Sequence, residues 1–222
     1  MKIENYIIKH LLQHVYFITG TAYAGKSTMV KMLAERYGMV FCGENYFSDL
    51  SDRIADPVLH PDLCYINSLA DFKDFVTRSA EEYARWINGT AKEAAEFEVA
   101  MLLALPRDKK VIVDTNIPLP LLKEISDYSR VAVMLSPQSM SVERFFDRSD
   151  PEKQYILSVI ESCDDPAAVM ENYKKGLQLI NSKEVYGAFA ESGFFTLVRQ
   201  EGDGDTREEV CLKLARHFGL AE

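Results

Sequence analysis

The residues best suited to chemistry in this sequence are a lysine and a serine that follow two glycines at fixed spacing. Gly20, Gly25, Lys26 and Ser27 form the pattern G-x-x-x-x-G-K-S. Glycines let a backbone fold tightly around a phosphate with its N–H groups pointing inward, and a helix N-terminus behind the loop favours the negative charge. In such a loop the lysine reaches the β- and γ-phosphates, and the serine hydroxyl binds Mg²⁺. The pattern therefore predicts a phosphate-binding loop of the Walker A type.

The sequence on either side of the loop fits this interpretation. The apolar run 15–18 is typical of a buried strand, and residues 27–37 carry apolar side chains at helical spacing. The four fixed positions match by chance in about one chain in a hundred of this length, and the strand–loop–helix context makes a chance match rarer. We expect ATP to be bound through one continuous set of residues. These are Gly20, Thr21, Ala22, Tyr23, Ala24, Gly25, Lys26, Ser27 and Thr28.

Two carboxylates follow predicted strands, at the edge of a parallel sheet where ligands bind. Asp114 ends the apolar run 111–113, where a buried aspartate is costly unless a cation or hydrogen-bond donors offset its charge. We expect it to bind Mg²⁺ with Ser27, as a Walker B carboxylate does, although it is also suited to capping the next turn. Glu44 is expected to orient or deprotonate an acceptor hydroxyl, with a solvated turn as its alternative. The residue types leave open which acid is the base.

Other charged residues are candidates for contact with the phosphates or with a second substrate. Arg144 and Arg148 are four residues apart and share one face if their segment is helical. Charged side chains on helices are mostly exposed, so a solvated surface is the simpler interpretation of the remaining candidates. These are Asp49, Arg53, Arg78, Arg85, Glu96 and Glu98.

An alternation of strands and helices must bring these residues together. Apolar runs predict five strands, at 15–19, 39–42, 110–114, 131–135 and 194–198. Helices are predicted at 27–37, 69–88, 90–105, 139–148, 151–160 and 166–180, with a short one from Pro120 to Asp127 and one after Thr206. Asn88-Gly89 is expected to separate two of them, and residues 50–68 to be irregular. Parallel strands need such crossovers, so the pattern predicts a three-layer α/β/α sheet.

Length and composition narrow the remaining possibilities. The chain of 222 residues is 47% hydrophobic, which suits a single α/β domain over residues 1–222. A net charge of −9 argues against a nucleic-acid polymer or an anionic membrane as partner. There is no apolar run of membrane-spanning length and no signal-peptide core, so we expect a cytoplasmic protein. The four cysteines are far apart without a C-x-x-C pair, which indicates neither a zinc site nor a disulfide framework.

The order of these features resembles the P-loop small-molecule kinases of the nucleoside monophosphate kinase and shikimate kinase group. The shared features are the phosphate-binding loop, an acidic turn after strand two, a helical insertion, an apolar strand ending in Asp114, and Arg-x-x-x-Arg after strand four. The resemblance covers nearly the whole chain in layout, and its sharp motif is residues 20–28. The turn Glu44-Asn45-Tyr46-Phe47 is similar to the Asp-Asp-Phe-Tyr type turn of uridine-kinase-like enzymes, with glutamate first.

This resemblance implies a P-loop NTPase fold with strand order 2-3-1-4-5, a substrate-side helical insertion at 50–106 and a lid region at 138–165. Arg144 and Arg148 would lie in or beside the lid and stabilise phosphate charge during catalysis, and residues 200–205 would border the adenine. It implies an ATP- and Mg²⁺-dependent phosphotransferase, monomer or homodimer, acting on a hydroxyl or phosphate of a small metabolite or nucleotide. The chain lacks the paired acids and the glycine-rich turn of shikimate kinases and has Asp114-Thr115 where thymidylate kinases have Asp-Arg. Motifs therefore do not assign the acceptor.

Two other classes share the loop motif: an NTPase that hydrolyses ATP as a switch, and a nucleotide-binding protein without a second substrate. A switch needs a water-orienting residue and loops that respond to the γ-phosphate. The sequence carries no distinctive pattern for either feature. The helical insertion and the arginines after strand four favour a second-substrate site, and hence a kinase.

Overall fold

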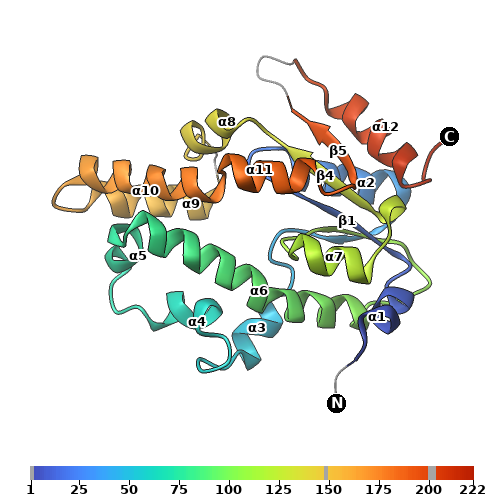
Figure 1. Cartoon of the computed structure of the whole chain (residues 1–222), viewed down its shortest axis with the longest axis horizontal. Coiled ribbons are helices and arrows are strands. Elements are labelled where there is room, and N and C mark those ends of the chain that lie inside the picture. The colour runs from blue at the N-terminus through green and yellow to red at the C-terminus, as the bar shows by residue number, and fades with distance from the viewer. Residues whose placement is uncertain (1–2, 148–149, 200–203) are drawn as a thin grey trace.

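The computed structural model describes residues 3–147, 150–199 and 204–222. Within these residues five strands form one parallel sheet in the order β2-β3-β1-β4-β5 (Figure 1). The strands are β1 (Val15–Gly20), β2 (Val40–Cys42), β3 (Val111–Asp114), β4 (Val131–Leu135) and β5 (Phe195–Val198). The number, direction and order of the strands expected from the sequence are confirmed.

The central strand β1 brings the ends of its neighbours to the loop. Ile18 pairs with Asp114 of β3 on one side, and Gly20 pairs with Met134 of β4 on the other. Because all strands run in the same direction, their carboxyl ends meet at one edge of the sheet. The chain that leaves β1 at Gly20 therefore passes between the ends of β3 and β4.

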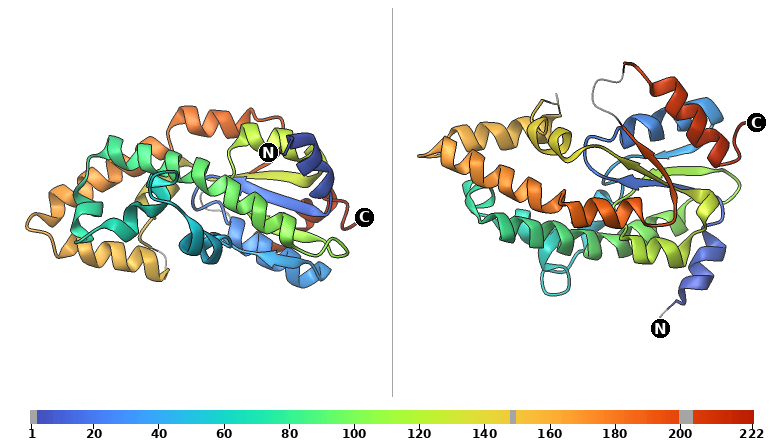
Figure 2. Two further views of the ribbon diagram at one scale, coloured as in Figure 1. Left: turned by 90° about the horizontal axis from the view of Figure 1, so that it is seen from below. Right: turned by 45° about the horizontal axis from the view of Figure 1, so that its top comes forward.

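Helices cover both faces of the sheet (Figure 2). On one face, α2 (Lys26–Tyr37) and α12 (Arg207–His217) pack against alternate side chains of β1, β3 and β4. On the other face lie α1 (Asn5–Leu11), α6 (Ala80–Ala104) and α7 (Leu119–Ile125). β3 and β4 are apolar on both faces because each face is covered, as is usual for parallel strands. A 3-10 helix, η1 (Tyr128–Arg130), leads into β4.

A second core lies away from the sheet. The helices between β2 and β3 are α3 (Ser48–Ile54), α4 (Pro61–Ser68), α5 (Lys73–Thr77) and α6. Those between β4 and β5 are α8 (Gln138–Glu143), α9 (Pro151–Glu161), α10 (Pro166–Ile180) and α11 (Lys183–Ala190). The two groups meet where α6 packs along α10 (Figure 1), around a shared apolar cluster. We call residues 48–104 and 138–190 the helical lobe.

Several expectations about these helices are wrong. Residues 50–68, expected to be irregular, contain most of α3 and all of α4. Asn88-Gly89 does not separate two helices, because α6 runs through it without a break. α6 begins at Ala80 rather than near residue 69, since Ser79 and Glu82 form a capping box with reciprocal side-chain and backbone hydrogen bonds. α8 ends at Glu143, short of the expected 139–148, and α11 has no counterpart among the predicted helices.

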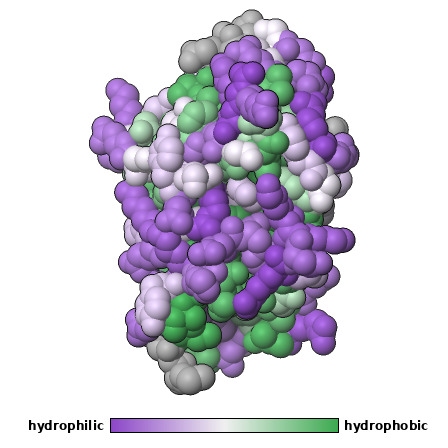
Figure 3. All heavy atoms as spheres, turned by 90° about the vertical axis from the view of Figure 1, so that its right-hand side faces the viewer, coloured by the Kyte–Doolittle hydropathy of each residue, from purple (hydrophilic) through white to green (hydrophobic). Residues whose placement is uncertain are grey.

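Most of the face that carries the C-terminus is hydrophilic, with apolar areas of limited size between the charged side chains (Figure 3). This composition is usual for a surface in contact with water. Among the described residues, no helix has both the length and the apolar character needed to cross a membrane. Cys42, Cys64, Cys163 and Cys211 are free thiols.

Candidate functional site

The two glycines of the loop motif are required by the backbone. Gly20 has a φ of 129°, and a Cβ built on it would lie 1.9 Å from the carbonyl oxygen of Met134. That oxygen accepts a hydrogen bond from the N–H of Thr21 at 3.0 Å, which closes the loop onto β4. Gly25 has a φ of 90° and is the N-cap of α2. Residues with a side chain rarely adopt such φ angles, so the loop conformation itself favours glycine at both positions.

The crest of the loop is held by residues of the segments that follow β4 and β5. The hydroxyls of Ser136 and Ser141 donate to the carbonyl oxygen of Ala22 at 2.6 and 2.9 Å. Tyr23 has a φ of 65°, unusual for a residue with a side chain, and its carbonyl oxygen accepts a hydrogen bond from Arg199 Nη1 at 3.0 Å. A strained residue of this kind persists only where its surroundings hold it. The loop is therefore held in its curved shape before any ligand binds.

The structure brings Lys26, Ser27 and Asp114 together. The hydroxyl of the exposed Ser27 donates a hydrogen bond of 2.6 Å to Oδ2 of the buried Asp114. Lys26 Nζ donates to the carbonyl oxygen of Thr21 at 3.1 Å, so the ammonium curls over the loop. A hydroxyl and a carboxylate side by side form an oxygen donor set of the kind that Mg²⁺ prefers beside nucleotide phosphates. These two residues fit the metal expected from the sequence.

A cavity of about 630 Å³ opens beside the loop, between α2, the end of β5 and the start of α12. Gly25 and Thr28 line it from the loop, and Arg199 lines it from the opposite side. Of the segment 200–205 expected to border the adenine, residues 200–203 lie outside the described ranges, while Gly204 and Asp205 line the cavity. Its size is within the range typical of small-molecule sites.

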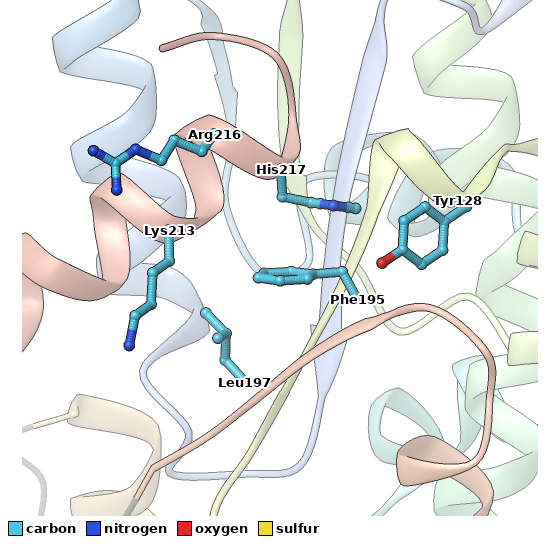
Figure 4. Close-up of a pocket in the computed structure, with 6 residues that line it drawn as sticks. All are labelled: Tyr128, Phe195, Leu197, Lys213, Arg216 and His217. Atoms are coloured by element: carbon cyan, nitrogen blue, oxygen red, sulfur yellow. The ribbon is translucent and has the colours of Figure 1, made fainter. Parts of the chain in front are cut away.

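A second hollow lies further from the loop, towards the start of β5 (Figure 4). It is lined by Tyr128, Phe195, Leu197, Lys213, Arg216 and His217. The ring of His217 stacks on Phe195 with centroids 4.3 Å apart, and its Nε2 lies 3.0 Å from the carbonyl oxygen of Val131. These contacts attach the end of α12 to the sheet. Neither the lysine nor the serine of the loop lines this hollow, so we assign it no part in the chemistry.

Two of the remaining predicted site residues, Glu44 and Arg144, are exposed. Glu44 is exposed in the turn after β2, and its side chain makes no hydrogen bond or ion pair within the described ranges. Arg144 is exposed at the end of α8, so the helix that would give it a common face with Arg148 has already ended. Arg148 lies outside the described residues.

One residue expected at the surface is instead buried beside the site. Glu98 is 1% exposed, and its Oε2 accepts a hydrogen bond from the hydroxyl of Thr115 at 2.6 Å. Burial raises the pKa of the Glu98 carboxyl to about 7, against the opposing effect of the hydrogen bond from Thr115. A sequence signal was available, since Glu98 stands four residues from both Ala94 and Leu102 on the apolar face of α6.

Arg78 is also enclosed rather than solvated. Its guanidinium lies 4.2 to 5.2 Å from the ring centroids of four aromatic residues of the helical lobe. These are Tyr65, Phe75, Tyr83 and Trp86. Burial lowers the pKa of Arg78 from its ordinary value. The other weak candidates, Asp49, Arg53, Arg85 and Glu96, are exposed, as expected.

Comparison of this chain with protein-family models, with curated protein sequences and with solved structures finds no match. An assignment of function therefore rests on the residues and the geometry described above.

Proposed function

We propose that this protein is a P-loop small-molecule kinase, which transfers the γ-phosphate of ATP to a hydroxyl or phosphate of a small metabolite or nucleotide. The observation that carries the proposal is the hydrogen bond of 2.6 Å between Ser27 and Asp114 at the end of the G-x-x-x-x-G-K-S loop. It joins the two residue types that bind Mg²⁺ in P-loop enzymes, and it forms between segments 87 positions apart. A chance match to the motif would not be expected to place its serine within hydrogen-bond distance of an aspartate at the end of a neighbouring strand.

The loop, the cavity and the acidic residues would each have a separate role in phosphoryl transfer. The backbone N–H groups of residues 20–28 would hold the phosphates of ATP, with the base in the cavity beside α2. Lys26 would stabilise the negative charge that develops on the transferred group. Mg²⁺ bound through Ser27 and Asp114 would neutralise further phosphate charge. Such transfer needs little covalent chemistry from the protein, so position and charge account for most of its contribution.

A carboxylate other than Asp114 must orient or deprotonate the acceptor hydroxyl, and we assign this role to Glu44. Asp114 is already engaged with Ser27, whereas Glu44 is exposed at the carboxyl end of β2, on the same edge of the sheet. Glu44→Gln should then reduce acceptor-dependent turnover strongly while ATP binding stays nearly intact. If Glu44→Gln is fully active and Asp114→Asn is inactive, the roles of the two acids are reversed.

The test of the whole proposal is to replace Lys26. Lys26→Ala should lower phosphoryl transfer on the order of 10²- to 10³-fold, because one preorganised charge at the transition state has about that effect. Its melting temperature should hardly change, since Lys26 lies in a polar loop. Lys31→Ala, an exposed position on the same helix, is the matched control and should keep parental activity. A fully active Lys26→Ala enzyme removes the proposal.

The assay follows the phosphorylated product from ATP across a panel of nucleosides, nucleoside monophosphates, hexoses and polyols. Turnover that one compound stimulates identifies a kinase and its acceptor. Turnover that no compound changes supports the alternative, an NTPase switch, and ATP binding without turnover supports a binding protein. The kinase we propose works in the cytoplasm as a monomer or homodimer on a small-molecule acceptor.

A role for the lid arginines is part of the same proposal. Next to Arg144, Val142, Phe145 and Phe146 pack into the core of the helical lobe, so this part of the region 138–165 is anchored. Arg144→Ala should slow turnover with little change in the stability of the free protein, because exposed arginines contribute little to folding. Unchanged turnover would leave Arg144 as a surface residue.

A further inference from the structure

Glu98 joins three segments around the candidate active site, through its buried carboxyl and its backbone carbonyl oxygen. Its Oε2 accepts a hydrogen bond from Thr115, the residue after Asp114, at 2.6 Å. Its backbone carbonyl oxygen accepts one from the phenol of Tyr46 at 3.1 Å. Tyr46 belongs to the turn after β2, Glu98 to the insertion helix α6, and Thr115 to the end of β3. Hydrogen bonds thus connect the acceptor-side turn to the strand end that carries the metal-binding acid.

Stability does not account for a glutamate at this position. Its neighbours Ala95, Val99 and Leu102 pack into the apolar core against the sheet. Oε1 is sealed from solvent and has no hydrogen bond of normal geometry within the described part of the chain. A buried polar atom without such a partner is unfavourable, and an apolar side chain of similar size would commonly stabilise the fold more. A residue kept at a cost to stability beside a ligand site points to a role in function.

Thr115 is the residue through which Glu98 reaches the site. Thr115 is fully buried, and its N–H donates to the carbonyl oxygen of Ile18 in β1 at 3.0 Å. Its hydroxyl oxygen accepts a hydrogen bond from the N–H of Ile117 at 3.0 Å while donating to Glu98. The backbone immediately after Asp114 is therefore held by β1, by the following turn and by α6. Without the carboxyl, the hydroxyl of Thr115 loses its acceptor, and one of these three attachments is lost.

We propose that Glu98 is a positioning residue for phosphoryl transfer, which holds the turn after β3 and thereby sets Asp114 relative to the acceptor-side turn. This inference rests on the proposed kinase function. Glu98 touches neither the phosphate loop nor the nucleotide cavity in the described chain. Its replacement should therefore lower kcat for transfer and leave the affinity for ATP unchanged.

The experiment compares Glu98→Met and Thr115→Val, which remove the hydrogen bond from either side, with Thr115→Ser, which keeps the hydroxyl. Transfer is measured with ATP and the compound of the panel that yields most product. Glu98→Met and Thr115→Val should lower kcat roughly 10- to 100-fold, the size expected from a small misplacement of catalytic groups. Their affinity for ATP should stay within about twofold. The double variant should be no worse than Thr115→Val, which removes the hydrogen bond to Glu98 and also the one accepted from Ile117.

Two controls separate positioning from a loss of structure. Thr115→Ser should restore transfer to the parental rate, and Glu96→Met, on the exposed side of the same helix, should leave every quantity unchanged. Glu98→Met should melt close to the parent, because removal of the buried carboxyl is favourable and the Thr115 hydroxyl left without an acceptor is unfavourable.

The inference is overturned if Glu98→Met and Thr115→Val transfer phosphate at the parental rate. It is also overturned if kcat, ATP affinity and melting temperature all fall together, because that pattern indicates a structural role alone. A parent enzyme that binds ATP but phosphorylates nothing in the panel contradicts the kinase proposal instead, and the positioning role with it. An active parent with unaffected variants removes the positioning role and leaves the kinase proposal standing.

Discussion

The sheet and the helical lobe each bury a charged residue, and they hold it by different interactions. Asp114, at the end of β3, accepts a hydrogen bond of 2.6 Å from Ser27. Arg78, in the helical lobe, lies under four aromatic rings, and its Nε and Nη2 have no hydrogen-bond partner within the described residues. Hydrogen bonds depend steeply on distance and angle, whereas the attraction between a cation and an aromatic face varies gradually. The hydrogen bond at the sheet edge therefore holds the carboxylate of Asp114 in one position. The helical lobe can shift slightly while the guanidinium of Arg78 keeps its contact with the aromatic rings.

The two cores also differ in the kind of side chain that fills them. Most side chains packed on the sheet are aliphatic, and they fill the space between straight strands and helices. The core of the helical lobe contains the rings of Phe75, Tyr83 and Tyr173, with Trp86 packed against them. Glu98 lies on α6, the helix that takes part in both cores. The predictions below test how strictly each part controls position.

The largest effect is expected at the loop. Gly20→Ala should reduce the free energy of unfolding by about 4 kcal/mol or prevent folding, because the new Cβ would lie 1.9 Å from the carbonyl oxygen of Met134. Gly38→Ala is the control: its φ is 62° but its surroundings are open, so the cost should be about 1–2 kcal/mol. Urea denaturation of both variants measures the difference. Equal losses would show that backbone angle alone, and not the approach of β4, selects Gly20.

A smaller effect, which depends on pH, is expected at Glu98. The pKa of this carboxyl is about 7 in the folded protein against an ordinary value of 4.5, so the folded state binds the proton more tightly than the unfolded chain. The resulting stabilisation is complete below about pH 4.5 and is lost as the pH rises through 7. The difference between a pKa of about 7 in the folded protein and the ordinary 4.5 corresponds to about 3 kcal/mol in the free energy of unfolding.

Glu98→Gln removes this titration. The free energy of unfolding of the variant, relative to that of the parent, should therefore rise by about 3 kcal/mol from pH 5 to pH 8. Urea denaturation at each pH measures this difference. Glu96→Gln, exposed on the same helix, should show the same dependence on pH as the parent. If the difference between Glu98→Gln and the parent does not change with pH, Glu98 does not titrate in this range, and its burial is less costly than the geometry indicates.

The smallest effect is expected in the helical lobe. Arg78→Met should lower the free energy of unfolding by about 1 kcal/mol, because lost attraction to the rings is partly offset by relief of an unpaired buried cation. Its ATP turnover should match that of the parent. Arg85→Met, exposed on α6, should change stability by less than about 0.5 kcal/mol. A fall in turnover for Arg78→Met at unchanged stability would contradict the division between the lobe and the site.

The sheet was more predictable than the helical lobe because each strand is marked by an apolar run within its own residues. Apolar runs place all five strands to within about two residues of the observed bounds. The start of α6 also had a local signal in Ser79 and Glu82, but the pair Asn88-Gly89 suggested a break that does not exist. The helix continues there because α4 packs across it, so closely that a Cβ on Gly89 would lie 1.7 Å from Asp62 Oδ2.

By itself the sequence determined the G-x-x-x-x-G-K-S loop and the strands, because these depend on what each residue allows its own backbone to do. Glycines stand where φ is positive, and a lysine and a serine follow at a fixed spacing. The tertiary structure alone decided which segments cover the charged residues of the insertion. Arg78 and Arg85 lie on neighbouring stretches, as do Glu96 and Glu98, yet one of each pair is enclosed. The difference comes from the segments that pack over them, α10 and the end of β3, and an amphipathic pattern does not name the segment that will cover it.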